Sequence, residues 1–513
     1  MTRSLSVRMF KDTYLDSVLQ LMGTRAMEGM SGVAWAAVAM ATAANVETLS
    51  GRGFPSDDLV GGSPADLFIA VEAIDDETAA SATAEAERVM FAARQSRDTT
   101  GQVAPRSLVE ALLQQPASNI AVISVPGEYA ALEAHKALGR GLDVLLFSDN
   151  VSRRDEIELK EHARLRDRLL MGPGAGTAML GGVGLAFANV VRNGRVGVIA
   201  AAGTGAQEAM ALLDRWGVGV SHVIGLGGRD LNEDVGGRMA RQAIDYLKND
   251  AGTDVILFVS KPPAPRVARE LLALAEGTPM IAAFMGVDTG MPVPTGVLVA
   301  DTLEGGVVKA VEALGLVPPD TTSLRGPSIV DAIARVDADR TTIRGLYSGG
   351  TLCYEALVLL ARHFGPVYSN TPVDKALGMP APEHSSILLD LGEEEYTKGR
   401  PHPMIDPQAR GEFLEDLADD PHVAVIVMDV VLGYGSHPDP AGVLAPACRR
   451  LVADGGPQVV TYVLGTEGDP QGYQAQVDEL AAAGCIVTET AARAALASAA
   501  IAARQPGIAN VPL

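Results

Sequence analysis

The chain has 513 residues, 47% of them hydrophobic and 20% charged, so it can form several domains with buried cores and is not a disordered protein. Its formal net charge of −22 and its aromatic content of 4% exclude a typical nucleic-acid binder, which needs basic surfaces and aromatic stacking platforms. The three cysteines, Cys353, Cys448 and Cys485, are too few and too scattered for a disulfide framework or a zinc cluster, so we predict no metal site.

The N-terminal segment does not have the composition of a targeting sequence. Residues 1–17 lack the apolar region of a signal peptide, and the alanine-rich stretch at 31–46 is shorter than the roughly 20 residues of a membrane-spanning helix. The few cysteines suit a reducing compartment. We therefore expect a cytoplasmic protein with no membrane partner.

Short β-branched runs, glycine turns and alanine-rich amphipathic runs alternate along the chain, and this alternation predicts an α/β fold with parallel sheets. Residues 1–106 are predicted to form an N-terminal α/β domain with strands at Ser4–Met9, Val33–Ala39 and Asp66–Ala73. Residues 107–190 are predicted to form a Rossmann-like domain that ends near the glycine-rich turn Gly172–Thr177.

The remainder of the chain contains an internal repeat, which predicts two duplicated flavodoxin-like domains at 191–316 and 341–513. The connection between them is residues 317–340. The matched pairs are Val196–Ala209 with Ile343–Ala356, Val255–Ser260 with Val423–Met428, and Pro279–Gly286 with Gln458–Gly465. The alternative is that unrelated Rossmann-like units simply look alike.

In both copies a strand leads through a glycine–threonine turn into a helix. Glycines permit a tight turn, and the N-terminus of a helix presents unpaired N–H groups with a partial positive charge. Such a turn suits a phosphate or a carboxylate, although it can also be a turn without a ligand. The predicted ligand-binding residues are Gly203, Thr204 and Gly205 in the first copy and Gly349, Gly350 and Thr351 in the second.

A second glycine loop, Gly227-Gly228-Arg229, follows a strand in the first copy, at the edge where α/β sheets bind ligands. The Arg229 guanidinium is a candidate donor to an oxyanion. The alternative is a surface pair between Arg229 and Asp230.

The peptide at 399–406 combines an anion holder, Arg400, with a proton carrier, His402, between two prolines that stiffen it. A charge at Arg400 would lower the pKa of His402. A rigid lead into the next helix is the alternative. Asp429 and Lys261 end matching strands, and we expect both in the same crevice, although solvated strand ends are an alternative. Asp429 could assist His402 in proton transfer.

These motifs resemble two related families. The turns at Gly203-Thr204 and Ser348–Thr351 resemble the phosphate-binding turns of NDP-forming acyl-CoA synthetases, of which succinyl-CoA synthetase is the familiar member. Blocks such as Gly225–Leu231, Phe258–Pro263 and Gly399–Pro407 resemble the FdrA family, which joins α-like and β-like synthetase parts in one chain. The FdrA resemblance covers nearly the whole chain.

The resemblance implies a component of a carbamoyltransferase of the oxamate carbamoyltransferase type, in the breakdown of allantoin and purine nitrogen. It would act with separately encoded partner subunits on a small-molecule substrate, with phosphate or carbamoyl phosphate as ligand; CoA binding and homo-oligomer formation are further expectations. The alternatives are an acyl-CoA synthetase-like ligase and a non-catalytic scaffold. In the ligase alternative CoA would bind across residues 107–190, which resemble the second half of the synthetases' CoA-binding domain. The synthetases carry phosphate on a histidine after the strand written here as Pro279–Gly286, and this chain has no histidine there, so we expect no phosphohistidine.

Overall fold

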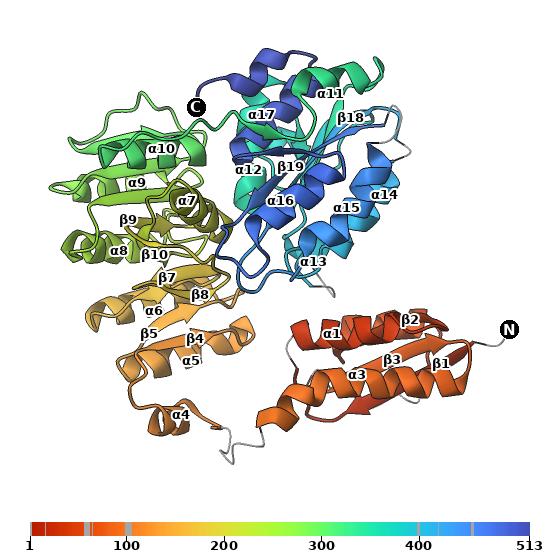
Figure 1. The fold of residues 1–513 in the computed structure, drawn as a ribbon. Helices are drawn as coiled ribbons and strands as arrows, with labels where there is room; N and C mark the ends of the chain where they lie inside the picture. Colours follow the sequence, from red (N-terminus) through yellow and green to blue (C-terminus); the bar gives the residue numbers. More distant parts are fainter. Residues whose placement is uncertain are drawn as a thin grey trace. The chain divides into compact units, whose positions relative to one another are not determined.

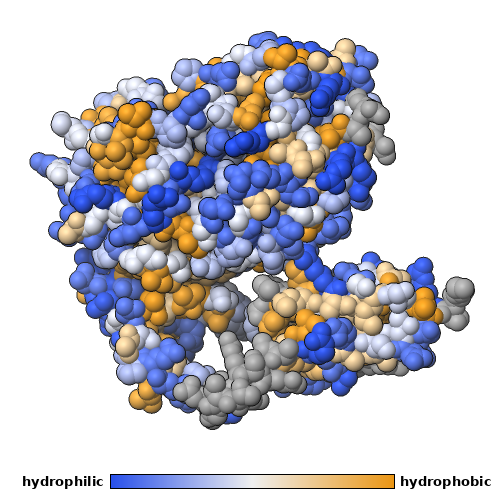
Figure 2. Space-filling model, viewed as in Figure 1, coloured by the Kyte–Doolittle hydropathy of each residue, from blue (hydrophilic) through white to orange (hydrophobic). Residues whose placement is uncertain are grey.

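The computed structural model describes residues 3–15, 17–55, 62–63, 65–97, 105–397, 401–418, 420–452 and 456–513. The chain divides into two compact units (Figure 1). The first contains residues 1–107 and 394–401, and the second contains residues 108–393 and 402–513. No helix in the described ranges is both long enough and apolar enough to cross a membrane. Hydrophilic side chains cover much of the visible face of the second unit (Figure 2).

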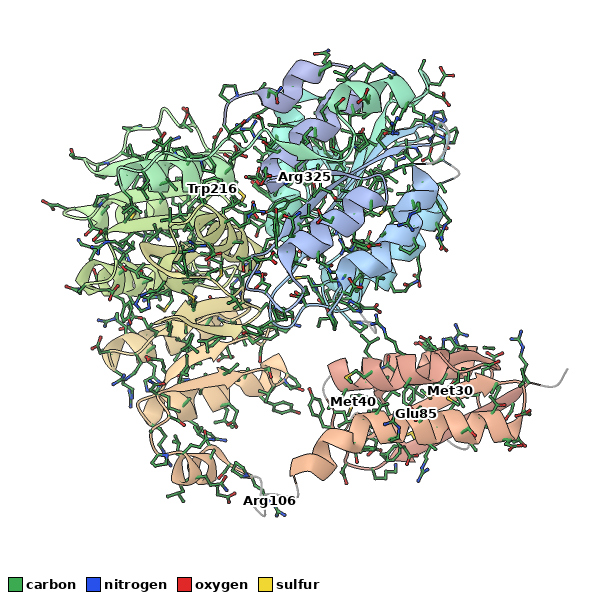
Figure 3. The ribbon with its side chains drawn as sticks, in the orientation of Figure 1. Met30, Met40, Glu85, Arg106, Trp216 and Arg325 are labelled. Atoms are coloured by element: carbon green, nitrogen blue, oxygen red, sulfur yellow. The ribbon has the colours of Figure 1, made fainter. Side chains whose placement is uncertain are left out.

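The first unit is a three-stranded sheet with helices. Its elements are β1 (Ser4–Phe10), α1 (Ser17–Glu28), β2 (Val33–Met40), α2 (Ala43–Gly51), β3 (Leu67–Ala73) and α3 (Asp76–Arg97). The predicted strand positions are confirmed, but a parallel sheet is wrong here: the order is β1-β3-β2, with β3 antiparallel to both neighbours. Helix α1 carries the chain over to β2, and β3 then inserts between the two strands, as in a split β–α–β unit. Met30 and Met40 pack against its core (Figure 3).

The second unit begins with helix α4 (Leu108–Gln114) and a small parallel sheet, in the order β4-β5-β6. Its elements are β4 (Ile120–Ile123), α5 (Gly127–Gly139), β5 (Asp143–Leu146), α6 (Arg153–Leu165) and β6 (Leu170–Met171). The glycine turn after β6 leads into the hairpin β7 (Thr177–Leu180) and β8 (Val183–Ala186), which joins the next sheet.

Two seven-stranded sheets follow, and their central strands repeat the same flavodoxin-like order. The first sheet is β13-β12-β11-β9-β10-β7-β8 and the second is β14-β20-β19-β18-β15-β17-β16. Strand pairing is parallel from β13 to β10 and from β20 to β16. The predicted duplication, and with it the α/β fold class, is therefore confirmed. The strands of the first sheet are β9 (Asn193–Ala200), β10 (Val220–Gly225), β11 (Val255–Ser260), β12 (Met280–Phe284) and β13 (Val297–Ala300).

The second sheet contains β14 (Leu324–Arg325), β15 (Thr342–Tyr347), β16 (Tyr368–Ser369), β17 (Ile387–Asp390), β18 (Val423–Val431), β19 (Gln458–Leu464) and β20 (Ile486–Thr488). The helices of the first copy are α7 (Gly203–Arg215), α8 (Arg238–Asn249), α9 (Pro265–Leu272) and α10 (Leu303–Ala313). Those that follow in this unit are α11 (Ile329–Arg335), α12 (Gly350–His363), α14 (Gln408–Leu417), α15 (Pro440–Leu451), α16 (Tyr473–Ala482) and α17 (Ala491–Ala502), while the short helix α13 (Glu394–Thr397) belongs to the first unit.

The two copies hold each other through reciprocal buried glutamates. Glu208 on α7 accepts hydrogen bonds from the Tyr462 hydroxyl and from the Ala491 N–H at the start of α17. Glu355 on α12 accepts a 2.6 Å bond from the Leu303 N–H at the start of α10. Each copy therefore caps a helix of the other, and one hydrophobic core runs through both.

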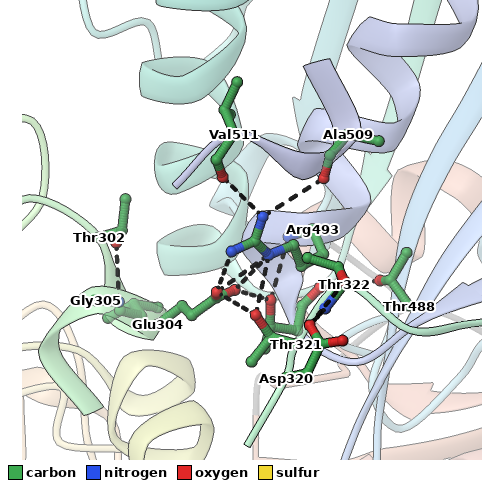
Figure 4. A network of polar contacts seen from close by, with 12 residues as sticks. Thr302, Glu304, Gly305, Asp320, Thr321, Thr322, Thr488, Arg493, Ala509 and Val511 are labelled. Atoms are coloured by element: carbon green, nitrogen blue, oxygen red, sulfur yellow. Dashed lines mark hydrogen bonds and ion pairs between the residues drawn. The ribbon is translucent and has the colours of Figure 1, made fainter. Parts of the chain in front are cut away.

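A buried ion pair reinforces this interface. Arg493 on α17 donates to the Glu304 carboxylate on α10 at 2.6 Å, while Thr321 and Thr490 also donate to Glu304 (Figure 4). Arg493 further donates to the main-chain carbonyl of Val511 at 2.9 Å. Because every charge in this cluster has a partner, the two copies form one rigid support for the site described below.

The buried Glu208 should make stability depend on pH. Burial raises its pKa to about 7, against the lowering effects of Tyr462 and Arg215. A raised folded-state pKa stabilises the fold at low pH, and this stability is lost as pH rises toward 7. Between pH 5.5 and 8.5 the free energy of unfolding of the native chain should fall by about 2 kcal/mol more than that of the Glu208→Gln variant, whose amide mimics the protonated acid. Thermal unfolding at the two pH values measures this difference. The exposed Glu312→Gln should behave like the native chain, and a Glu208→Gln variant with the native pH dependence would contradict the assignment.

Candidate functional site

The N-termini of α7 and α12 meet at a cavity of about 350 Å³. The N–H of Thr351 approaches the Thr204 hydroxyl at 3.4 Å. A Cβ on Gly205 would lie 2.9 Å from the Thr351 methyl, and one on Gly349 would lie 3.0 Å from the Thr204 methyl. These two glycines therefore allow the helices to approach each other closely, and they bring the two predicted turns into one crevice.

At the α7 side of the cavity the helix N-terminus is open. The preceding residue, Ala202, has no side chain that could cap the first-turn N–H groups, which lack intrahelical partners. Thr177 lines the cavity beside Gly203, and its buried hydroxyl has no hydrogen-bond partner. Lys261, which follows β11, also lines the cavity, with its ammonium 5.1 Å from the Tyr354 ring centroid. This combination of free amides, a hydroxyl and a cation is suited to an anion.

At the α12 side, where the N-cap residue Gly349 also has no capping side chain, a buried carboxylate binds the turn just before the helix. Asp429 accepts hydrogen bonds from the Ser348 N–H at 2.8 Å, the Ser348 hydroxyl at 2.9 Å and the Gly349 N–H at 2.7 Å. Arg410, which is also buried, forms an ion pair with Asp429 at 3.2 Å. Asp429 thus holds the turn from behind, where it does not line the cavity, and no observation supports a direct part in proton transfer.

Asp390, the last residue of β17, fills the remaining space at this helix end. One of its oxygens accepts the Gly392 N–H at 3.0 Å, and the other lies 2.2 Å from where a Cβ on Gly350 would be. Burial raises the pKa of Asp390 to about 6. Sequence reasoning missed this residue, although the Leu391-Gly392 match to Leu226-Gly227 marks its position.

The duplicated site is therefore asymmetric in charge. The second copy has Asp390 at the end of β17 where the first has Gly225 at the end of β10, and Asp429 where the first has Lys261. Lys261 directly follows β11, but Asp429 lies inside β18, which continues to Val431, so the expectation that Asp429 ends its strand is wrong. The expectation of two equivalent phosphate turns does not fit, because the Asp390 carboxylate lies against Gly350 and would repel an anion there, and the Thr351 N–H is directed at the Thr204 hydroxyl. Only the α7 turn, at Gly203 and Thr204, has surroundings suited to phosphate.

His402 lines the cavity as a neutral hydrogen-bond donor. Its Nδ1 accepts the Met404 N–H at 3.2 Å, so the ring proton is on Nε2, close to Gly392. Burial, with a smaller contribution from Arg410, lowers the pKa of His402 to about 4, and Asp429 opposes this. The lowering of the His402 pKa agrees with the prediction, but the predicted cause, Arg400, lies outside the described residues.

The glycine loop with Arg229 has a structural role. The Arg229 guanidinium pairs with Glu156 at 2.9 Å and donates to the Val151 carbonyl at 2.7 Å, so it is not directed at a ligand in the cavity. A Cβ on Gly227, whose φ is +80°, would lie 2.2 Å from the Pro173 carbonyl oxygen. The predicted oxyanion role of Arg229 therefore has no geometric support; of this loop only Gly228 lines the cavity.

Three protein families match parts of the chain. The CoA-ligase family matches residues 346–501, the CoA-binding domain matches residues 191–286, and the AllF heavy metal-associated domain matches residues 1–105. The CoA-binding match lies in the first copy of the repeat and not in residues 107–190, where the resemblance had placed CoA. Together with the fold, these matches define an acyl-CoA synthetase-like protein.

The chain is 39% identical to the uncharacterized protein YahF of Escherichia coli over 507 residues, which cover 96% of this chain and 98% of YahF. It therefore belongs to the FdrA/AllF-like family of acyl-CoA synthetase-like proteins that includes YahF. The alpha subunit of the ADP-forming succinate–CoA ligase of Methanothermobacter thermautotrophicus is 25% identical over 235 residues, covering 44% of this chain and 77% of that subunit. A dinucleotide-forming acetyl-coenzyme A synthetase of Ca. Korarchaeum cryptofilum matches with 14% identity and a TM-score of 0.30, covering 76% of this chain and 84% of that structure.

The N-terminal unit does not have the residues to hold a heavy-metal ion. Residues 1–105 contain neither cysteine nor histidine, the usual ligands of copper and zinc. Among the described residues of the whole chain, no group of three or more potential ligands is arranged to bind a metal. We therefore assign no metal chemistry to this unit.

Proposed function

We propose that this protein transfers an acyl group between phosphate and the thiol of CoA, with an acyl phosphate bound in the cavity between α7 and α12. The observation that carries this proposal is the open N-terminus of α7 beside the unpartnered Thr177 hydroxyl and Lys261. The matches to CoA-ligase and CoA-binding families support CoA as the acceptor. On the apolar side of the cavity, Phe147, Phe187 and Met404 provide contacts suited to a thiol arm.

The side chains suggest a division of roles. Free amides of α7, the Thr177 hydroxyl and Lys261 would hold the phosphate oxygens as the acyl carbon–oxygen bond breaks. His402 would donate its Nε2 proton as a hydrogen bond to the acyl oxygen, which gains negative charge. Asp390, with a pKa of about 6, is mostly ionised at neutral pH and would take the proton of the acceptor.

Carbamoyl transfer between phosphate and a small acceptor, in a complex with partner subunits, is a second candidate. Two observations favour a direct reaction of this kind: the cavity is small, and the nitrogen lone pair of His402 that a phosphate carrier needs is engaged by the Met404 N–H. A non-catalytic scaffold remains the alternative from a different class.

Phosphate exchange separates these readings. The protein is incubated with labelled inorganic phosphate and either acetyl phosphate or carbamoyl phosphate, with and without CoA. CoA-dependent entry of label into acetyl phosphate is the expected result. Label entering carbamoyl phosphate only with oxamate as acceptor would favour the second candidate. The absence of exchange in every arm, with partner subunits present, would contradict both and favour the scaffold.

The protein should carry no phosphohistidine at any stage of the reaction. The Met404 N–H occupies Nδ1 of His402, so the ring presents a proton rather than a lone pair to the cavity. Incubation with an acyl phosphate labelled in its phosphoryl group should leave no acid-labile, base-stable label on the chain. Label on His402 would instead restore a mechanism with a phosphorylated intermediate.

A further inference from the structure

The α12 side of the cavity wall carries negative charge. Asp390 is buried, and its second oxygen points past Gly350 into the cavity, while Glu393 lines the same wall. The Asp390 carboxylate is held in place by the Gly392 N–H at 3.0 Å, so it cannot turn away without losing that bond.

Among the described residues of the cavity wall, positive charge is limited to one side chain. Of the described residues that line the cavity, Lys261 alone is a lysine or an arginine. Arg410 is sealed behind the wall, where it is paired with Asp429. His402 is a neutral donor, as its bond from Met404 requires. A bound phosphate would therefore use the one cation of the site.

An acyl group that carried its own carboxylate would then have to lie near Asp390 without a compensating charge. Two like charges a few ångströms apart in a partly desolvated site repel each other, and relieving the repulsion would require one of them to take up a proton. An uncharged acyl group avoids this repulsion and can accept a hydrogen bond from His402 through its carbonyl oxygen.

Building on the proposed function, we infer that the site accepts acyl phosphates whose acyl group is small and uncharged, and that Asp390 excludes acyl groups bearing a carboxylate, such as succinyl. The succinate–CoA ligase subunits that resemble the first copy would thus differ from this protein in acyl specificity. Asp390 is the residue that determines this selectivity.

The test compares two hydrolysis-resistant analogues, acetylphosphonate and succinylphosphonate, by isothermal titration calorimetry with the full-length chain. We expect acetylphosphonate to bind at least 10-fold more tightly. Asp390→Asn, which keeps the oxygen that accepts the Gly392 N–H, should reduce this ratio to less than about 3-fold.

A matched control is Asp288→Asn. Asp288 is exposed, does not line the cavity, and accepts the N–H of Gly290 two residues on at 2.9 Å, in the same local arrangement as Asp390 and Gly392. The Asp288→Asn variant should leave the ratio of the affinities for acetylphosphonate and succinylphosphonate unchanged. Equal binding of the two analogues by the native chain, or an unchanged ratio in Asp390→Asn, would overturn the inference while leaving the phosphate site in place. Binding of neither analogue would overturn the proposed function as well.

Discussion

Replacing Lys261 with methionine is expected to weaken the binding of inorganic phosphate by at least about 100-fold, a loss of about 3 kcal/mol. Lys261 is the one lysine or arginine among the described residues that line the cavity. Asp390 and Glu393 line the same cavity. Without the ammonium group, the free amides of α7 would have to hold phosphate against an acidic surface. Equilibrium dialysis with labelled phosphate measures the loss.

The control for this variant is Lys136→Met, which removes an exposed lysine on α5 that pairs with Glu133. Its phosphate affinity should match that of the native chain. If Lys261→Met bound phosphate as well as the native chain, the anion site would have to lie elsewhere, and the roles assigned to the α7 turn would be wrong.

Replacing Arg410 with methionine should have the largest effect on stability. We expect it to lower the free energy of local unfolding around the pair by about 3–5 kcal/mol. The variant leaves Asp429 buried without its counterion, and Asp429 is the group that holds the turn before α12 through Ser348 and Gly349. Burial lowers the pKa of Arg410 and Asp429 opposes this shift, which reflects their mutual dependence. Amide hydrogen exchange in β15 and β18 should accelerate by about 100-fold or more.

Arg450→Met provides the comparison, because Arg450 pairs with Glu415 at 2.8 Å where both side chains are exposed. Such a surface pair contributes less than about 1 kcal/mol. Equal exchange rates in β15 and β18 for the two variants would show that the buried pair does not support the turn.

Local patterns in the sequence were sufficient to place most strands and to detect the duplication. The Val255–Ser260 and Val423–Met428 runs are β11 and the greater part of β18, because continuous apolar runs bounded by polar residues identify buried parallel strands. The antiparallel first sheet was not predictable in this way, because strand direction depends on which strands pair and not on the pattern within each strand.

The partners of the polar side chains were beyond sequence reasoning, since they come from distant parts of the chain. Arg229 was expected to bind an oxyanion, but it meets Glu156 on α6. Asp429 was expected in the crevice, but it is committed to the turn at Ser348. Asp390 was not selected because no motif surrounds it; a comparison of the two copies, which sets it against Gly225, would have identified it.

On the function proposed above, the duplication would produce one anion site rather than two. The same turn and helix occur twice, but the residues in and just after the carboxyl-terminal parts of the strands decide which helix N-terminus can receive a ligand. Lys261 in the first copy favours an anion, whereas the corresponding Asp429 in the second neutralises the turn from within the protein.

The most direct measurement of this account is a crystal structure of the full-length protein with inorganic phosphate. We expect one phosphate in the cavity, within hydrogen-bonding distance of the N–H groups at the start of α7, the Thr177 hydroxyl and the Lys261 ammonium. A phosphate bound instead at the start of α12, beside Asp390, or at equal occupancy at both helix ends, would contradict it.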